Sequence, residues 1–107
     1  MDEAWIKAAT LAHVRTANGR RRKPIVTAEF TLGSSGVRAD LAIFADTTIG
    51  LEIITAKDSF RRLPSQMSAY ARYFQHVVAV IAPCHLKNVR AEYLCGASLW
   101  TYDDGSL

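Results

Sequence analysis

Two periodicities alternate along the chain, one typical of amphipathic helices and one typical of strands. Apolar residues recur at helical spacings between Asp2 and Thr16, and the acidic residues at the start suit the positive end of a helix dipole. We therefore expect a first helix that ends at Asn18-Gly19. Its expected buried positions are Trp5, Ile6, Ala9, Leu11 and Ala12, with His13 as a further candidate.

Three runs rich in β-branched and apolar residues follow, and short turn sequences separate them. The runs cover residues 25–31, 37–44 and 50–55, and Gly33-Ser34-Ser35-Gly36 forms the first turn. A loop at residues 46–48 joins the second run to the third. Runs of this composition between turn signals predict a set of strands joined as hairpins.

The second half of the chain predicts a helix and a buried strand. Leu63-Pro64 marks the start of the helix, because proline is tolerated at the first helical position and biases the residue before it away from helical angles. We expect this helix to cover residues 64–74, with Met67, Ala71 and Phe74 as its apolar stripe. The nearly apolar run at 76–83 predicts a strand covered on both faces. A short helix near residues 85–93 and a last strand near 98–102 complete the series.

The order of elements is helix, three strands, helix, strand and a small appendage. It predicts an α/β (α+β mixed) fold with a four-stranded mixed sheet flanked by helices, in which the third and fourth strands are parallel. At 107 residues, and without repeats or a linker, the chain is expected to form a single domain over residues 1–107.

Composition excludes several classes of protein. Half of the residues are hydrophobic and 21% are charged, which is typical of globular proteins and argues against a disordered or fibrous chain. No run approaches the roughly 20 apolar residues of a membrane span, and the start lacks the pattern of a signal peptide, so we expect a cytoplasmic protein without a membrane partner. Cys84 and Cys95 lack a CxxC pair or nearby histidines, which favours buried free thiols over a zinc site.

Asp40 and Glu52 lie in two adjacent predicted strands. Because side chains alternate along a strand, Glu52 shares one face with Ile54, and Arg38 has the parity of Asp40. If the hairpin register brings Asp40 beside Glu52, the two carboxylates can hold a hard cation such as Mg²⁺, with water and phosphate oxygens as its other ligands. Surface charge on a hairpin is the alternative for this pair taken alone.

The next helix carries Gln66 and Tyr70 four positions apart. Asp40, Glu52 and this Gln66-x-x-x-Tyr70 motif, in that order, resemble the PD-(D/E)XK nuclease superfamily, in particular its branch with a QxxxY helix motif. More specifically, four segments look like those of small stand-alone bacterial and phage proteins in that superfamily. They are Arg38-Ala39-Asp40, Leu51-Glu52-Ile53, Arg61-Arg62-Leu63-Pro64-Ser65-Gln66 and Tyr70-Ala71-Arg72-Tyr73-Phe74.

The resemblance covers residues 25–85 and implies a restriction-endonuclease-like core with the order αβββαβ. It also implies cleavage of DNA phosphodiesters with Mg²⁺ or Mn²⁺ as cofactor, with Asp40 and Glu52 as metal ligands. Glu29 is a candidate for a further metal ligand and Glu3 a weaker one. Cross-strand pairing and stabilisation of the helix start are the respective alternatives for these two residues.

The resemblance gives Gln66 and Tyr70 the role of orienting the site or contacting the nucleic-acid backbone; a polar contact between helix and sheet is the alternative. Basic residues cluster around this region although the formal net charge is only +3, which fits a polyanionic partner such as DNA. Ordinary solvated charge is the alternative. The candidates for contacts with phosphate are Arg38, Arg61, Arg62 and Arg72, with the block Arg20–Lys23 as a further patch.

Ile54 stands where the family pattern has a lysine, two residues after the glutamate. A lysine there positions or activates the attacking water and stabilises developing charge, so we expect impaired hydrolysis with metal binding retained. Lys57 can replace it as a catalytic group only if the chain bends after Thr55, because a continued strand would carry it about 10 Å further and to the other face. Arg38 can clamp phosphate, but its guanidinium is a poor general base.

Two functional classes follow from this reasoning. One is a metal-dependent DNA endonuclease-like protein with impaired catalysis, in which Ile54 is either natural or introduced. The other is a non-catalytic DNA-binding or protein-interaction module on a nuclease fold. A homodimer or a larger protein complex would suit the two strands of a duplex.

Overall fold

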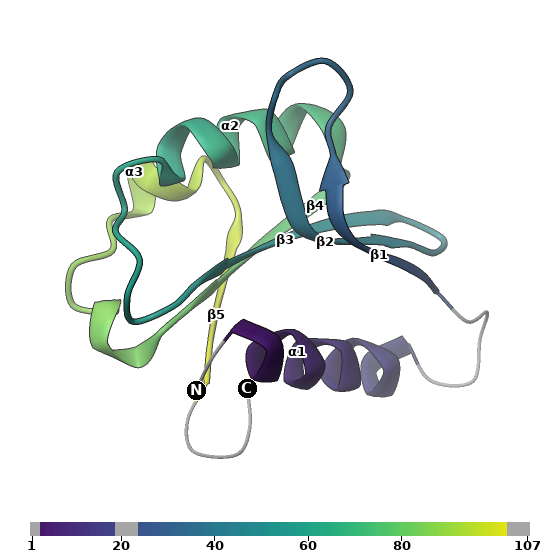
Figure 1. Ribbon diagram of the computed structural model, residues 1–107, viewed down its shortest axis with the longest axis horizontal. Coiled ribbons are helices and arrows are strands. Elements are labelled where there is room, and N and C mark those ends of the chain that lie inside the picture. Colours follow the sequence, from purple (N-terminus) through teal and green to yellow (C-terminus); the bar gives the residue numbers. More distant parts are fainter. Residues whose placement is uncertain (1–2, 19–23, 103–107) are drawn as a thin grey trace.

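The β-rich runs of the sequence form one mixed sheet with helices on both faces (Figure 1). The structure is a computed structural model that describes residues 3–18 and 24–102. Within these ranges no helix is both long and apolar enough to cross a membrane. The elements are α1 (Glu3–Asn18), β1 (Ile25–Thr31), β2 (Arg38–Phe44), β3 (Thr48–Ile54), α2 (Leu63–Tyr73), β4 (His76–Ile81), the 3₁₀ turn η1 (Pro83–His85), α3 (Ala91–Leu94) and β5 (Ser98–Thr101).

The sheet has five strands in the order β1-β2-β3-β4-β5. The first three strands pair antiparallel, while β3 and β4, and then β4 and β5, pair parallel. The mixed α/β class, the element order and the parallel pairing of β3 with β4 are confirmed. The prediction of four strands is wrong, because the last strand pairs along Val78–Ile81 and gives the buried β4 a neighbour on its second edge.

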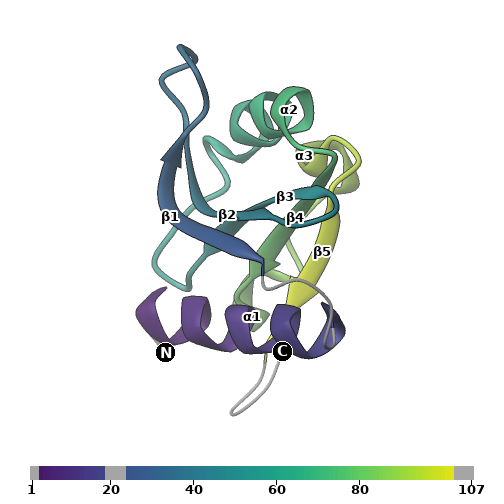
Figure 2. The same cartoon turned by 90° about the vertical axis from the view of Figure 1, so that its right-hand side faces the viewer.

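Helix α1 covers one face of the sheet, and α2 and α3 cover the other (Figures 1 and 2). Among the side chains of α1 up to Val14, the buried ones are Ile6, Thr10 and Val14, which are spaced four residues apart. Ala12 and His13, which were expected on this face, are exposed. The Thr10 hydroxyl is buried without a hydrogen-bond partner among the described residues.

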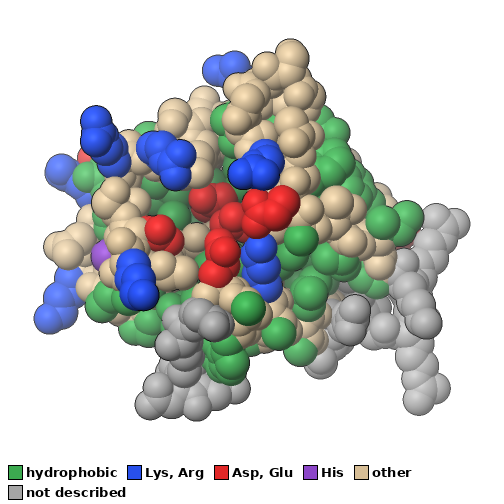
Figure 3. Space-filling model, viewed as in Figure 1, with side chains coloured by type: hydrophobic (Ala, Val, Ile, Leu, Met, Phe, Trp, Pro, Cys, Tyr) green, Lys and Arg blue, Asp and Glu red, His purple; other side chains and the backbone are tan. Residues whose placement is uncertain are grey.

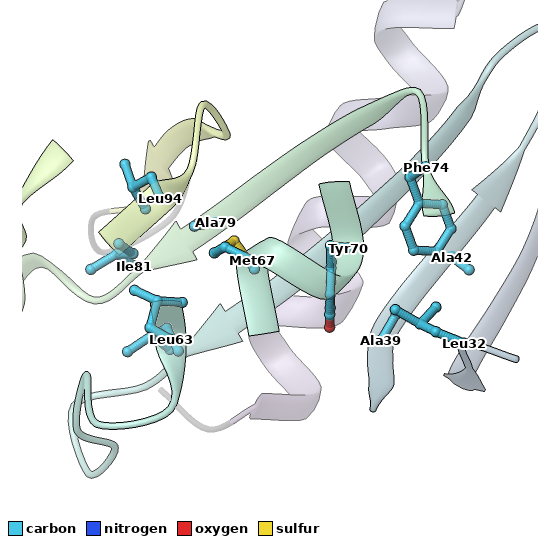
Figure 4. Packing of buried hydrophobic residues seen from close by; sticks show 11 residues of the cluster. Leu32, Ala39, Ala42, Leu63, Met67, Tyr70, Phe74, Ala79, Ile81 and Leu94 are labelled. Atoms are coloured by element: carbon cyan, nitrogen blue, oxygen red, sulfur yellow. The ribbon is translucent and has the colours of Figure 1, made fainter. Parts of the chain in front are cut away.

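Helix α2 packs against the opposite face through Leu63, Met67, Tyr70 and Phe74 (Figure 4). Ala71 was predicted to belong to this stripe but is exposed. The ring of Tyr70, rather than the methyl group of Ala71, faces the sheet because burying the ring removes far more apolar surface from water.

The region after β4 differs from the prediction in two respects. The expected helix at residues 85–93 is split into η1 and α3, because Arg90 is extended, with φ −111° and ψ 142°. Both cysteines are free, as predicted, but they are exposed rather than buried. Cys84 lies in the 3₁₀ turn, and Cys95 ends α3 in the left-handed region at φ 48°.

Gly50 lies in β3 directly under the ring of Phe74. A Cβ atom at position 50 would lie 2.2 Å from Phe74 Cδ2 and 2.5 Å from Cε2, and this ring is only 5% exposed. We expect Gly50→Ala to lower the free energy of unfolding by about 1–3 kcal/mol, because the ring must leave its packed position. Urea denaturation measures this change. In a Phe74→Leu background the penalty should shrink, and an equal penalty in both backgrounds would contradict the clash.

Candidate metal site in an acidic cleft

Strands β2 and β3 separate at the point where the two predicted carboxylates lie. Their antiparallel pairing reaches Leu41 opposite Leu51 and stops there, so Asp40 and Glu52 occupy the next position along. Beyond this point β2 continues beside β1, and β3 continues beside β4. Asp40 Oδ2 accepts a hydrogen bond of 2.7 Å from the Ile53 amide, which satisfies a donor that the parted strands leave open.

Tyr70 joins both strands to helix α2. Its hydroxyl donates a hydrogen bond to Glu52 Oε1 and lies 3.2 Å from the Arg38 carbonyl oxygen. The Asp40 amide donates to the same hydroxyl at 3.3 Å. Because Tyr70 is fully buried, it can orient the carboxylates but cannot touch a nucleic acid. The expected role of contacting the nucleic-acid backbone is therefore incompatible with this geometry, whereas the expected role of orienting the site is compatible with it.

Burial and mutual repulsion favour protons on the two carboxyls. Burial, followed by the negative charge of Asp40, raises the pKa of Glu52 to about 8. Burial likewise raises the pKa of Asp40 to about 6, against the opposing hydrogen bond from the Ile53 amide. The pKa of the Tyr70 hydroxyl is also raised, first by burial and then by the charge of Glu52. The acid pair therefore holds about one proton near neutral pH when no cation is bound.

The acid pair lies in a cleft of about 1000 Å³. Figure 3 shows acidic side chains gathered at the centre of this face, with lysine and arginine side chains around them. Tyr70 is buried beneath the cleft, and Arg72 is exposed on α2 outside the lining. The predicted residues that line it are Glu3, Glu29, Arg38, Asp40, Glu52, Ile54, Lys57, Arg61, Arg62 and Gln66. The basic block Arg20–Lys23 lies outside the described residues.

Ile54 lies beside the acid pair, on the face of β3 that Glu52 also uses. It is 4% exposed and belongs to the apolar cluster of Leu63 and Met67, while it also lines the cleft. The expected placement of an aliphatic side chain next to the carboxylates is confirmed. A lysine at this position would bring a positive charge to the face of β3 that Glu52 uses.

Lys57 reaches the cleft because the chain turns directly after β3. The Asp58 carboxylate accepts hydrogen bonds from the Thr55 amide at 2.8 Å and from the Thr55 hydroxyl at 3.0 Å. His85 Nε2 lies 3.0 Å from the Thr55 carbonyl oxygen on the other side of the turn. The bend that a displaced lysine requires is therefore present, although Lys57 itself is exposed.

Glu29 of β1 lines the cleft and forms an ion pair with Lys7. Lys7 Nζ lies 2.9 Å from Glu29 Oε1. Sequence reasoning missed Lys7, although its position four residues after Glu3 places both on one face of the helix. Within the described residues, no three Asp, Glu, His or Cys side chains converge as a ready metal site. The pair of half-buried Asp40 and buried Glu52 still fits a cation such as Mg²⁺, which proteins hold through one or two carboxylates with water and phosphate.

A model of the family described as bacteriophage P4 protein cII matches residues 1–100. The chain belongs to the bacteriophage P4 cII protein family. No curated protein and no solved structure matches this cII-family chain. The family match extends from the first residue into β5, as far as Trp100. The family description names no activity, so the nuclease resemblance stays a prediction from the motifs.

The raised pKa values make the stability of the metal-free protein depend on pH. A folded state whose Asp40 and Glu52 pKa values lie above those of the unfolded chain loses stability as pH rises from about 4 to about 8. Glu52→Gln keeps an acceptor for Tyr70 and removes one ionisation. We expect this variant to lose less stability than the parent over that interval in denaturation experiments with EDTA. Parallel pH profiles for the two proteins would contradict the burial of an ionisable pair.

Proposed function

We propose that this cII-family chain is a metal-dependent DNA endonuclease-like protein with impaired catalysis, on a PD-(D/E)XK-type, restriction-endonuclease-like core. One observation carries the proposal: from beneath a cleft that Asp40 and Glu52 line and arginines border, the tyrosine of the QxxxY motif hydrogen-bonds Glu52 and the Asp40 amide. The element order α1, β1–β3, α2 and β4 supports the proposal of such a core, to which β5 would be an addition. A phage or bacterial setting agrees with the family description.

In the proposed site, Asp40 and Glu52 would hold Mg²⁺ or Mn²⁺. When bound, such a cation polarises a phosphodiester and lowers the pKa of a water molecule. Tyr70 keeps Glu52 in place through its hydrogen bond, and the Ile53 amide does the same for Asp40. Gln66, half-buried in the lining of the cleft, would position the phosphate or the water that enters.

The basic residues on the cleft support nucleic acid as the ligand. Arg61 and Arg62 at the start of α2, and Arg38 on β2, are exposed and line the cleft. They would bind phosphates on either side of the acidic floor. A homodimer or a larger protein complex would be needed to address both strands of a duplex from one site per chain.

Catalysis is expected to be weak because, among the residues that the structure describes, the lysine position of the motif beside the acid pair carries no positive charge. Ile54 fills that place with an apolar side chain. Lys57 lies on an exposed turn, so its flexible side chain must be immobilised before its charge can act. The turn after Thr55 supports a second candidate, an active endonuclease in which Lys57 supplies the cation. A non-catalytic DNA-binding or protein-interaction module is the alternative that the apolar Ile54 favours.

Ile54→Lys tests whether the site is intact apart from its lysine. We expect this variant to nick plasmid DNA with Mg²⁺ or Mn²⁺ at least about 100-fold faster than the parent, because it gains a cation beside the developing charge. Nicking assays and calorimetry on the same preparations separate turnover from metal binding. Ile54→Met is the matched uncharged control, and adding Asp40→Asn should remove both activity and metal binding. Robust cleavage by the parent that Lys57→Ala abolishes would instead establish Lys57 as the replacement.

Binding of DNA should be mainly electrostatic and should depend on Arg61 and Arg62. Replacing both by alanine should weaken binding and reduce the dependence of the logarithm of affinity on the logarithm of salt concentration by about 2. Fluorescence anisotropy across a salt series measures both quantities. Arg72→Ala, which removes an exposed charge outside the cleft lining, should have a smaller effect. An affinity for DNA that does not change with salt concentration, or that is the same in the double variant as in the parent, would favour the protein-interaction module.

A further inference from the structure

The ion pair of Lys7 and Glu29 joins the two layers of the molecule at the border of the acidic cleft. Lys7 belongs to α1 and Glu29 to β1, which are 22 residues apart in sequence. The lysine side chain is 20% exposed and the glutamate side chain 46% exposed, so the contact is partly shielded on the lysine side. Glu29 lines the cleft, and so does Glu3, which lies one helical turn before Lys7.

The backbone at Glu29 is in a conformation that side chains rarely adopt. Its φ is 53°, in the left-handed region, although it lies inside a strand. The neighbouring residues Ala28 and Phe30 pair with Leu41 and Ala39, so Glu29 and Asp40 face each other at an unpaired position. Such strain persists only where the surrounding contacts impose it. The 2.9 Å bond to Lys7 is one contact that holds the strained residue in place.

The charges of this border act on one another. The hydrogen bond from Lys7 is the main cause that lowers the pKa of Glu29, so this carboxylate remains ionised. Partial burial opposes the charge of Lys7, but its bond to Glu29 and the charges of Glu29, Glu3 and Asp40 raise its pKa overall. Lys7 is therefore a cation held among the acids of the cleft.

We propose that the Lys7–Glu29 ion pair is a latch on the cation site. Lys7 keeps Glu29 away from the pair of Asp40 and Glu52, and a divalent cation gains Glu29 as a third carboxylate ligand only when the ion pair opens. The inference rests on the proposed function, because it requires a cation at Asp40 and Glu52. A formed Lys7–Glu29 ion pair would explain why, among the described residues, Asp40 and Glu52 have no third carboxylate converging with them as a ligand. Lys7 thus lowers the affinity for the cation, both by its charge and by its hold on a ligand.

Calorimetric titration of the full chain with Mn²⁺ tests the latch. Lys7→Met keeps the aliphatic stem and removes the charge, and we expect it to bind Mn²⁺ about tenfold more tightly than the parent, because affinity follows the number of charged ligands. Lys7→Gln is a second variant with the same expectation, and circular dichroism checks that both are folded. Lys7→Arg should bind like the parent. Lys87→Met removes an exposed lysine charge outside the cleft lining and should change the affinity by less than about twofold.

The double variant Lys7→Met with Glu29→Gln decides whether the gain passes through the glutamate. The latch requires that the gain disappear in this protein, and a gain that persists, or that Lys87→Met reproduces, overturns it. Asp40→Asn separates the two proposals. If Asp40→Asn abolishes binding while both Lys7 variants bind like the parent, the latch is wrong and the cation site stands. If no form binds Mn²⁺, the cation site is wrong and the latch falls with it.

Discussion

The hydrogen bond from the Ile53 amide to the Asp40 carboxylate is the contact on which the cleft depends. It ends the pairing of β2 and β3, because a side chain takes the amide that a neighbouring strand would otherwise use. Each strand then follows its other neighbour, and the sheet opens between them. If β2 and β3 stayed paired beyond Leu41 and Leu51, the two strands would remain adjacent and would leave no opening between them for a cleft. The polar site is therefore a consequence of where the backbone ladder stops.

Through Tyr70, the packing of the apolar core determines the geometry of the polar site. Its ring packs with Met67 and Phe74 on the sheet-facing side of α2, while its hydroxyl reaches Glu52. A buried carboxyl without such a partner would be costly, so the tyrosine both fills the core and satisfies the acid. The position of α2 in turn depends on Gly50, over which the Phe74 ring lies. We therefore expect changes in this packing to alter the orientation of the carboxylates in the cleft.

Local pattern was enough to predict most of the elements. Apolar periodicity predicted the main helices and strands, and the alternation of side chains placed Ile54 on the face of Glu52. The meeting of Asp40 and Glu52 was predicted from the order of motifs that resembles the nuclease superfamily. The missed features depend on contacts between distant residues. The pairing of β5, the burial of Tyr70 in place of Ala71 and the ion pair of Lys7 all lack a local signal. The left-handed conformation of Glu29 is likewise imposed by its neighbours in the fold.

The distribution of charge in the cleft couples three equilibria in the proposed function. Phosphate is attracted by the arginines at the border but repelled by ionised carboxylates on the floor, so it approaches most easily when a proton or a cation neutralises them. Because the raised pKa values let Asp40 and Glu52 hold a proton at neutral pH, a cation must displace that proton before it binds. Phosphate bound by the arginines would then favour the cation over the proton, since only the cation can also accept phosphate oxygens as ligands. Proton release, cation binding and binding of nucleic acid are therefore expected to be thermodynamically linked through the same two carboxyls.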